Sequence, residues 1–148
     1  HDLAAAGADG LIVPDLLPEH SGEFESACVD HGLHMIRFVA PTTAKPRLAK
    51  IGTGARGFVY CVSVTGVTGS RSELADSLPT YLEHVRQAMD LPRVVGFGIS
   101  KPDHVRTIKS IAEGAIVASA LIDIVNRNGP TTRVSAAAAH VRQLLAAT

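Results

Sequence analysis

The sequence predicts an α/β fold in which five βα units build a parallel sheet covered by helices. Five short apolar runs recur along the 148 residues, and helical patterns with their own start signals lie between them. No run is joined to the next by the short turn that an antiparallel hairpin needs. We expect residues 1–148 to form a single domain, because their number suits one ordinary core.

The predicted strands are nearly continuous apolar runs, as strands buried on both faces of a parallel sheet are. The first begins at residue 11 and the last at residue 115, and each gap is long enough for one helix. The expected strands are Leu11–Val13, Met35–Val39, Phe58–Val62, Val94–Val95 and Ala115–Val117.

Several predicted helices begin at a proline, which fits the first helical turn because its missing N–H has no helical partner there. The segment Ser100–Asp103 has instead the pattern of a capping box. A stripe of Val134, Ala138, Val141 and Leu145 predicts that the last helix is amphipathic. The expected helices are Glu19–Asp30, Pro46–Ile51, Thr80–Met89, one after the capping pattern, Leu121–Val125 and Thr132–Thr148.

Five consecutive βα units fit either an open doubly wound sheet or part of a (β/α)8 TIM barrel, and the loops favour the barrel. In a barrel, ligands bind at the carboxyl ends of the strands, often with a phosphate held by the last loops and a short extra helix. Segments 65–69, 96–100 and 118–120 follow three successive strand ends, and a short helix is predicted directly after the last of them. We therefore expect an incomplete TIM barrel.

The three loop segments have the composition of a phosphate site. Glycine lets backbone N–H groups approach phosphate oxygens, a helix amino terminus adds partial positive charge, and Ser119 adds a hydroxyl donor. The alternative interpretation is that the loop glycines only permit turns. Their grouping at successive strand ends favours phosphate binding.

Six motifs also occur in the order found in the tryptophan synthase alpha chain family, which the sequence resembles over nearly its whole length. They are Gly10–Leu16, Ala40–Thr43, Gly57–Tyr60, Thr65–Gly69, Gly96–Ser100 and Ser119–Ala120. The resemblance implies a cytoplasmic TIM barrel that cleaves indole-3-glycerol phosphate to indole and glyceraldehyde 3-phosphate in tryptophan biosynthesis. This retro-aldol reaction uses no metal or organic cofactor. In the family's α2β2 assembly, pyridoxal phosphate belongs to the partner beta chain, which receives the indole.

Carried over by position, the resemblance assigns nine site residues. Those expected around the phosphate are Gly69, Gly98, Ala118 and Ser119. Those expected along the indole and glycerol part of the pocket are Ile12, Val39, Tyr60 and Phe97, with Thr68 in a loop that closes over the substrate. Ala118 stands where the family commonly has glycine, and its methyl group restricts φ but keeps the N–H.

The resemblance also implies that three barrel strands precede His1 and carry the family's catalytic glutamate and aspartate. We therefore expect no catalytic residue within residues 1–148, and no turnover by this segment alone, because the cleavage needs an acid and a base. Two alternatives stay open: another phosphate-binding barrel enzyme, or a non-catalytic phosphate-binding or assembly module. The first would show catalytic Lys or Asp at strand ends, where only Asp15 occurs, and a turn role suits Asp15 better.

Composition excludes several other classes. The 14 basic side chains balance the 14 acidic ones and aromatic residues make up 4%, so neither a nucleic-acid surface nor base stacking is expected. No apolar run reaches the roughly 20 residues of a membrane span. The 2 cysteines fit buried free thiols, and the 7 scattered histidines fit surface positions rather than a metal site.

Three further residues have two interpretations each. Arg37 shares a strand face with Val39, so inside a barrel it needs a carboxylate from the preceding strands, unless the strand is bulged. Tyr60 either lines the pocket, which we prefer, or fills the barrel core. Arg71 either steers the phosphate or is a solvated loop residue.

Overall fold

The computed structural model describes residues 1–63, 76–96 and 98–148. Within these residues the five predicted strands form one parallel sheet, in the order in which they follow along the chain. They are β1 (Gly10–Ile12), β2 (His34–Val39), β3 (Val59–Val62), β4 (Arg93–Gly96) and β5 (Gly114–Ala115). The prediction of a parallel sheet built from consecutive βα units is confirmed.

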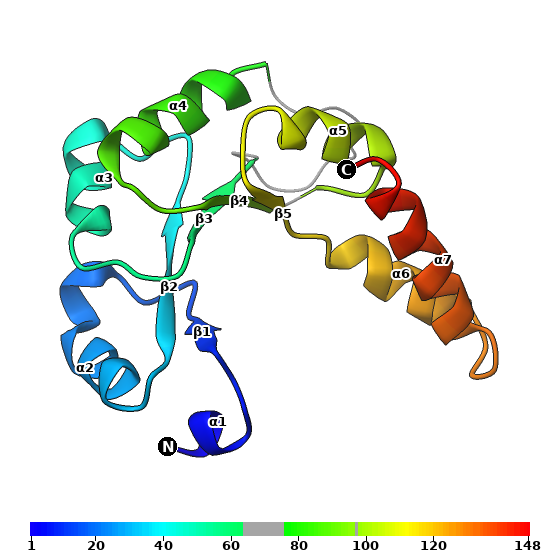
Figure 1. The fold of residues 1–148 in the computed structure, drawn as a ribbon, viewed down its shortest axis with the longest axis horizontal. Coiled ribbons are helices and arrows are strands. Elements are labelled where there is room, and N and C mark those ends of the chain that lie inside the picture. Colours follow the sequence, from blue (N-terminus) through cyan, green and yellow to red (C-terminus); the bar gives the residue numbers. More distant parts are fainter. Residues whose placement is uncertain (64–75, 97) are drawn as a thin grey trace.

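Helices cover one face of this sheet and follow one another around its outside (Figure 1). The helices are α1 (Asp2–Ala5), η1 (Pro18–His20, a 3-10 helix), α2 (Gly22–Asp30), α3 (Lys45–Gly52), α4 (Leu78–Ala88), α5 (Pro102–Lys109), α6 (Ser119–Arg127) and α7 (Arg133–Leu145). Helices α6 and α7 pack side by side and project beyond β5 (Figure 1). No helix in the three described ranges combines the length and apolarity that crossing a bilayer requires.

The main core lies between the sheet and helices α3, α4 and α5. On the sheet side it contains Val39, Val59, Cys61 and Val95, which point to one face because side chains alternate along a strand. On the helix side it contains Leu48, Ile51, Leu82, Val85 and Ile108. Cys28 and Cys61 are buried free thiols, as predicted.

The buried guanidinium of Arg37 finds its partner in the helix layer, which neither alternative anticipated. Arg37 is only 7% exposed, makes an ion pair with Glu25 of α2 and donates a 3.0 Å hydrogen bond to Ser21 Oγ. Strand β2 pairs with β3 in register from Arg37 to Val39, so there is no bulge at this point. Burial lowers the pKa of Arg37, and the carboxylate of Glu19 opposes this effect.

Ser21 also divides the helix predicted over residues 19–30. Its hydroxyl donates a 3.0 Å hydrogen bond to the Pro18 carbonyl and closes the short helix η1, after which α2 begins at Gly22. A serine hydroxyl that bonds a nearby backbone group competes with helix continuation in this way.

The predicted capping box does not form. Lys101 is the residue that precedes α5, no side chain caps the helix, and Asp103 pairs instead with Arg106. The Ser100 N–H donates to Nδ1 of His104, at 3.4 Å. His104 is buried, which corrects the expectation that every histidine lies at the surface.

The apolar stripe predicted for the last helix is wrong about which side chains are buried. Val134 and Leu145 are 73% and 61% exposed, and Leu144 is the buried residue of α7. The physical reason is that α7 packs along α6 and against α5, and only its carboxyl-terminal end, at Leu144, reaches the main core.

Both edges of the sheet are open among the described residues, since β1 and β5 each pair with a single strand. Ile12 on the β1 edge is 46% exposed. Unpaired edges template pairing between chains. We expect the 148-residue chain to self-associate at micromolar concentrations, and Ile12→Lys to reduce this association, as measured by analytical ultracentrifugation. A monodisperse monomer with a sharp unfolding transition would contradict the expectation.

Candidate phosphate-binding site

The carboxyl ends of β3, β4 and β5 meet at one edge of the sheet, because the strands are parallel and adjacent. The Ser63 N–H donates to the Gly96 carbonyl at 3.0 Å, just beyond β3. The Ile116 N–H donates to the Val95 carbonyl at 2.8 Å, just beyond β5. These two bonds hold the segments that leave the three strands side by side.

The loop after β4 turns sharply at Gly98. Gly98 has φ of +75°, a left-handed conformation that glycine adopts without the strain a side chain would add. The next residue, Ile99, is buried in the main core, and Ser100 is tied to His104. The loop that carries Gly98 is therefore anchored by an apolar side chain and by a hydrogen bond.

Helix α6 begins directly after the β5 segment. It runs over Ser119–Arg127, and no side chain caps its amino terminus, where Ala118 is the preceding residue. Its first turn contains no acidic residue, and the first N–H groups of any helix lack partners within the helix. The predicted extra helix is confirmed, and it begins two residues earlier and ends two residues later than the predicted range 121–125.

The structure thus brings Gly98, Ala118 and Ser119 to the same edge of the sheet, at the ends of neighbouring strands. Backbone N–H groups and the positive end of a helix are what a phosphate dianion needs. Gly69, Thr68 and Phe97, together with Arg71, lie outside the described residues.

The face of the sheet opposite the main core, called the open face below, carries an aromatic pair in which Tyr60 is itself only 9% exposed. Tyr60 of β3 stacks on Phe38 of β2, with ring centroids 4.6 Å apart and planes inclined by 22°. Strand register places Ile12 on the same face, since Ile12 pairs with Ile36, two residues before Phe38. Burial raises the pKa of Tyr60, so its hydroxyl stays protonated at neutral pH and can donate a hydrogen bond.

Sequence reasoning missed Phe38, and it counted Gly96 among the loop glycines of the expected phosphate site. Gly96 is the last residue of β4, and a Cβ there would lie 2.0 Å from the Tyr60 hydroxyl. Glycine is therefore required by the close approach of the tyrosine rather than by a turn. The period-two spacing of Ile36 and Phe38 was the available signal for Phe38, because it places both on the face opposite Arg37 and Val39.

We expect Gly96→Ala to destabilise the fold by about 1–3 kcal/mol, because the Tyr60 ring must leave its place against Phe38. Combining it with Tyr60→Leu should remove most of that cost, since the two changes are coupled. Gly22→Ala is the control, as a Cβ there meets nothing within 4 Å. Urea titration measures the free energy of unfolding of Gly96→Ala, Tyr60→Leu, the double variant and Gly22→Ala. If Gly96→Ala lowers stability equally with Tyr60 and with Leu at position 60, the contact is contradicted.

A family model described as "Tryptophan synthase alpha chain" matches residues 1–148. The chain belongs to the tryptophan synthase alpha chain family. A tryptophan synthase alpha chain of Roseiflexus castenholzii is 57% identical over 143 residues, which are 97% of this chain and 55% of that relative. One of Chloroflexus aggregans is 51% identical over 147 residues, 99% of this chain and 55% of the relative.

Solved structures agree with this membership. Mycobacterium tuberculosis tryptophan synthase superposes with a TM-score of 0.82 at 36% identity, covering 99% of this chain and 54% of that one. The tryptophan synthase α2β2 complex of Pyrococcus furiosus gives 0.86 at 34% identity, covering 98% and 58%. The expectation of a partial TIM barrel is confirmed by these neighbours. The chain spans about half the length of the alpha chains that it matches.

Of the nine residues assigned by resemblance to the alpha chains, the structure describes six, and one of these six lies apart from the other five. Val39 is 2% exposed and packs with Leu48 and Ile51 under the helices, on the face opposite Ile12 and Tyr60. The reason is the alternation of β2, which sends Phe38 to the open face and Val39 to the helix layer.

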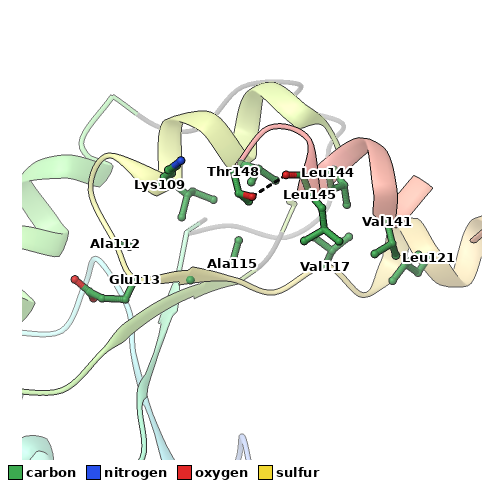
Figure 2. A pocket seen from close by; sticks show the side chains of 13 residues that line it. Lys109, Ala112, Glu113, Ala115, Val117, Leu121, Val141, Leu144, Leu145 and Thr148 are labelled. Carbon is green, nitrogen blue, oxygen red and sulfur yellow. Dashed lines mark hydrogen bonds between the residues drawn. The ribbon is translucent and has the colours of Figure 1, made fainter. Parts of the chain in front are cut away.

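A cavity among the described residues of this alpha-chain family member lies away from the candidate phosphate site. It measures about 450 Å³ and lies between β5, α5 and α7, on the helix side of the sheet. Figure 2 shows its mostly apolar lining, with Ala115, Val141 and Leu144 among the side chains that face it. Neither Gly98 nor Ser119 lines it, so it is separate from the candidate phosphate site.

Proposed function

We propose that this chain works as part of a tryptophan synthase alpha chain, in the retro-aldol cleavage of indole-3-glycerol phosphate to indole and glyceraldehyde 3-phosphate. The observation that carries the proposal is the meeting of the Gly98 loop and the uncapped amino terminus of α6 at one edge of the sheet. The family membership supplies the substrate class.

In this proposal the phosphate is bound by main-chain donors. Gly98, Ala118 and Ser119 supply N–H groups at the edge, the Ser119 hydroxyl adds a donor, and Gly69 completes the set. The positive end of α6 offsets the charge of the dianion without a lysine or arginine.

The rest of the substrate lies over the open face of the sheet. Ile12, Phe38 and Tyr60 offer an apolar and aromatic surface beside the phosphate edge. Phe97 and Thr68, assigned by resemblance, extend this surface and cover the substrate. An aromatic surface suits the indole ring, because stacked rings gain more than their buried area alone provides.

The chemical step requires two proton-transferring groups. An acid must protonate the indole carbon that is released and a base must take the proton of the glycerol hydroxyl, each contributing about 10²–10⁴-fold. We assign neither role within residues 1–148. The proposed partner for the released indole is a beta chain in an α2β2 assembly, as in the Pyrococcus furiosus complex.

The test is to soak crystals of the chain with glycerol phosphate and to assay indole release from indole-3-glycerol phosphate. We expect ligand density against Gly98 and Ser119, and no indole from the 148-residue chain by itself. Joining the chain to the amino-terminal part of the Roseiflexus castenholzii relative should restore indole release. Density far from both residues, or an inactive full-length hybrid that is folded, would overturn the proposal.

A further inference from the structure

We infer that His104 is a positioning residue of the phosphate site, which holds the loop of Gly98 in place by accepting the N–H of Ser100. The inference deepens the proposed function and rests on it. The contact is a 3.4 Å hydrogen bond from the Ser100 backbone to the Nδ1 atom of the imidazole. His104 is buried and Ser100 is half-buried, so the contact is partly shielded from competing water.

The loop needs such a hold because of what surrounds it. Gly98 is in the left-handed conformation and has no side chain of its own to anchor it. Ile99 secures the loop toward the core, where it is buried. Ser100 follows Ile99 and lies two residues before Pro102, where α5 begins. Its backbone N–H donates to His104 in the first turn of α5. The imidazole thereby ties the loop to the helix that follows it.

This contact resembles the backward reach of a capping box, but its donor is Ser100, one residue before Lys101, which precedes α5. In the usual pattern an acidic side chain in the first turn accepts an N–H from the residue before the helix. Asp103 has the right spacing but pairs with Arg106, and His104 takes over the acceptor role.

The donor identifies which ring nitrogen is the acceptor. A backbone N–H always carries its hydrogen, so Nδ1 must be unprotonated, and a neutral ring then carries its proton on Nε2. In this inference the contact restrains the Gly98 loop before a ligand arrives. A preorganised loop binds more tightly, because less ordering remains to be done on binding.

Two substitutions of His104 separate the acceptor from the bulk of the ring. In His104→Asn the Oδ1 atom takes the place of Nδ1 and keeps the acceptor, whereas His104→Leu keeps an apolar volume and removes it. We expect His104→Leu to weaken glycerol phosphate binding roughly three- to tenfold in calorimetry, and to speed hydrogen exchange of the Ser100 amide similarly. His104→Asn should restore both toward the original values.

A measurement on the unaltered chain keeps the test independent of whether the variants fold. The ¹⁵N chemical shifts of the His104 ring report which nitrogen carries the proton, and we expect Nε2. A proton on Nδ1, or a His104→Leu variant that loses thermal stability but binds glycerol phosphate as before, would overturn the inference. If the unaltered chain binds no glycerol phosphate, that result counts against the proposed function instead. The ¹⁵N shifts of the His104 ring and the hydrogen exchange of the Ser100 amide still test the role of His104 in that case.

Discussion

Ser119→Asp is expected to weaken glycerol phosphate binding at least about 100-fold, because it sets a carboxylate against the dianion at the amino terminus of α6. The fold itself should not suffer, since an acidic side chain in the first turn of a helix interacts favourably with the helix dipole. Isothermal titration calorimetry measures the affinity and a urea titration the free energy of unfolding. Lost binding with unchanged or raised stability is the expected combination.

The matched control is Thr132→Asp. Thr132 precedes α7 as Ala118 precedes α6, it is exposed, and the substitution makes the same change of charge beside a helix amino terminus. Because α7 follows no strand, this variant should bind glycerol phosphate like the unaltered chain. If both variants bind glycerol phosphate equally weakly, the effect is one of overall charge, and the amino terminus of α6 is not part of the site.

Glu25→Ala is expected to lower the free energy of unfolding by about 2–3 kcal/mol, because it leaves the buried Arg37 guanidinium without its counter-charge. This loss of stability is smaller than the roughly 3–5 kcal/mol that breaking a fully buried ion pair costs, because the Glu25 side chain is itself 34% exposed. Urea denaturation measures the loss. Glu23→Ala, an exposed carboxylate in the same first turn, is the control and should change stability little.

A second substitution tests the cause of that loss. Arg37→Met removes the buried charge while keeping an unbranched chain of similar reach, so the double variant with Glu25→Ala should regain most of the lost stability. If the double variant is as unstable as Glu25→Ala, the cost arises from α2 itself rather than from an unpaired charge.

Local sequence patterns determined the order and kind of the elements. The apolar runs, the helix-opening prolines and the glycine-rich segments are local features, and the structure places a strand at each run and α6 after the last of them. Gly98 could also be predicted as a site residue from a local feature, because glycine readily adopts the left-handed conformation that it has here.

Such local patterns could not predict contacts between side chains on different elements. The partner of Arg37 comes from α2 and that of Ser100 from α5, while the reason for a glycine at position 96 is a ring on the neighbouring strand. Each of these depends on which elements become neighbours. Local spacing could predict only that Arg37 and Val39 share a face, and it could not tell which face the helices cover.

The sequence by itself determined the parallel α/β sheet, its strand order and the family to which the chain is similar. Only the tertiary structure decided that Val39 belongs to the helix layer, that Phe38 joins Tyr60 on the open face and that a buried His104 contacts the loop of Gly98. The physical reason is range: hydrophobic period and turn chemistry act over a few residues, whereas burial and hydrogen-bond partners depend on segments far apart in the chain.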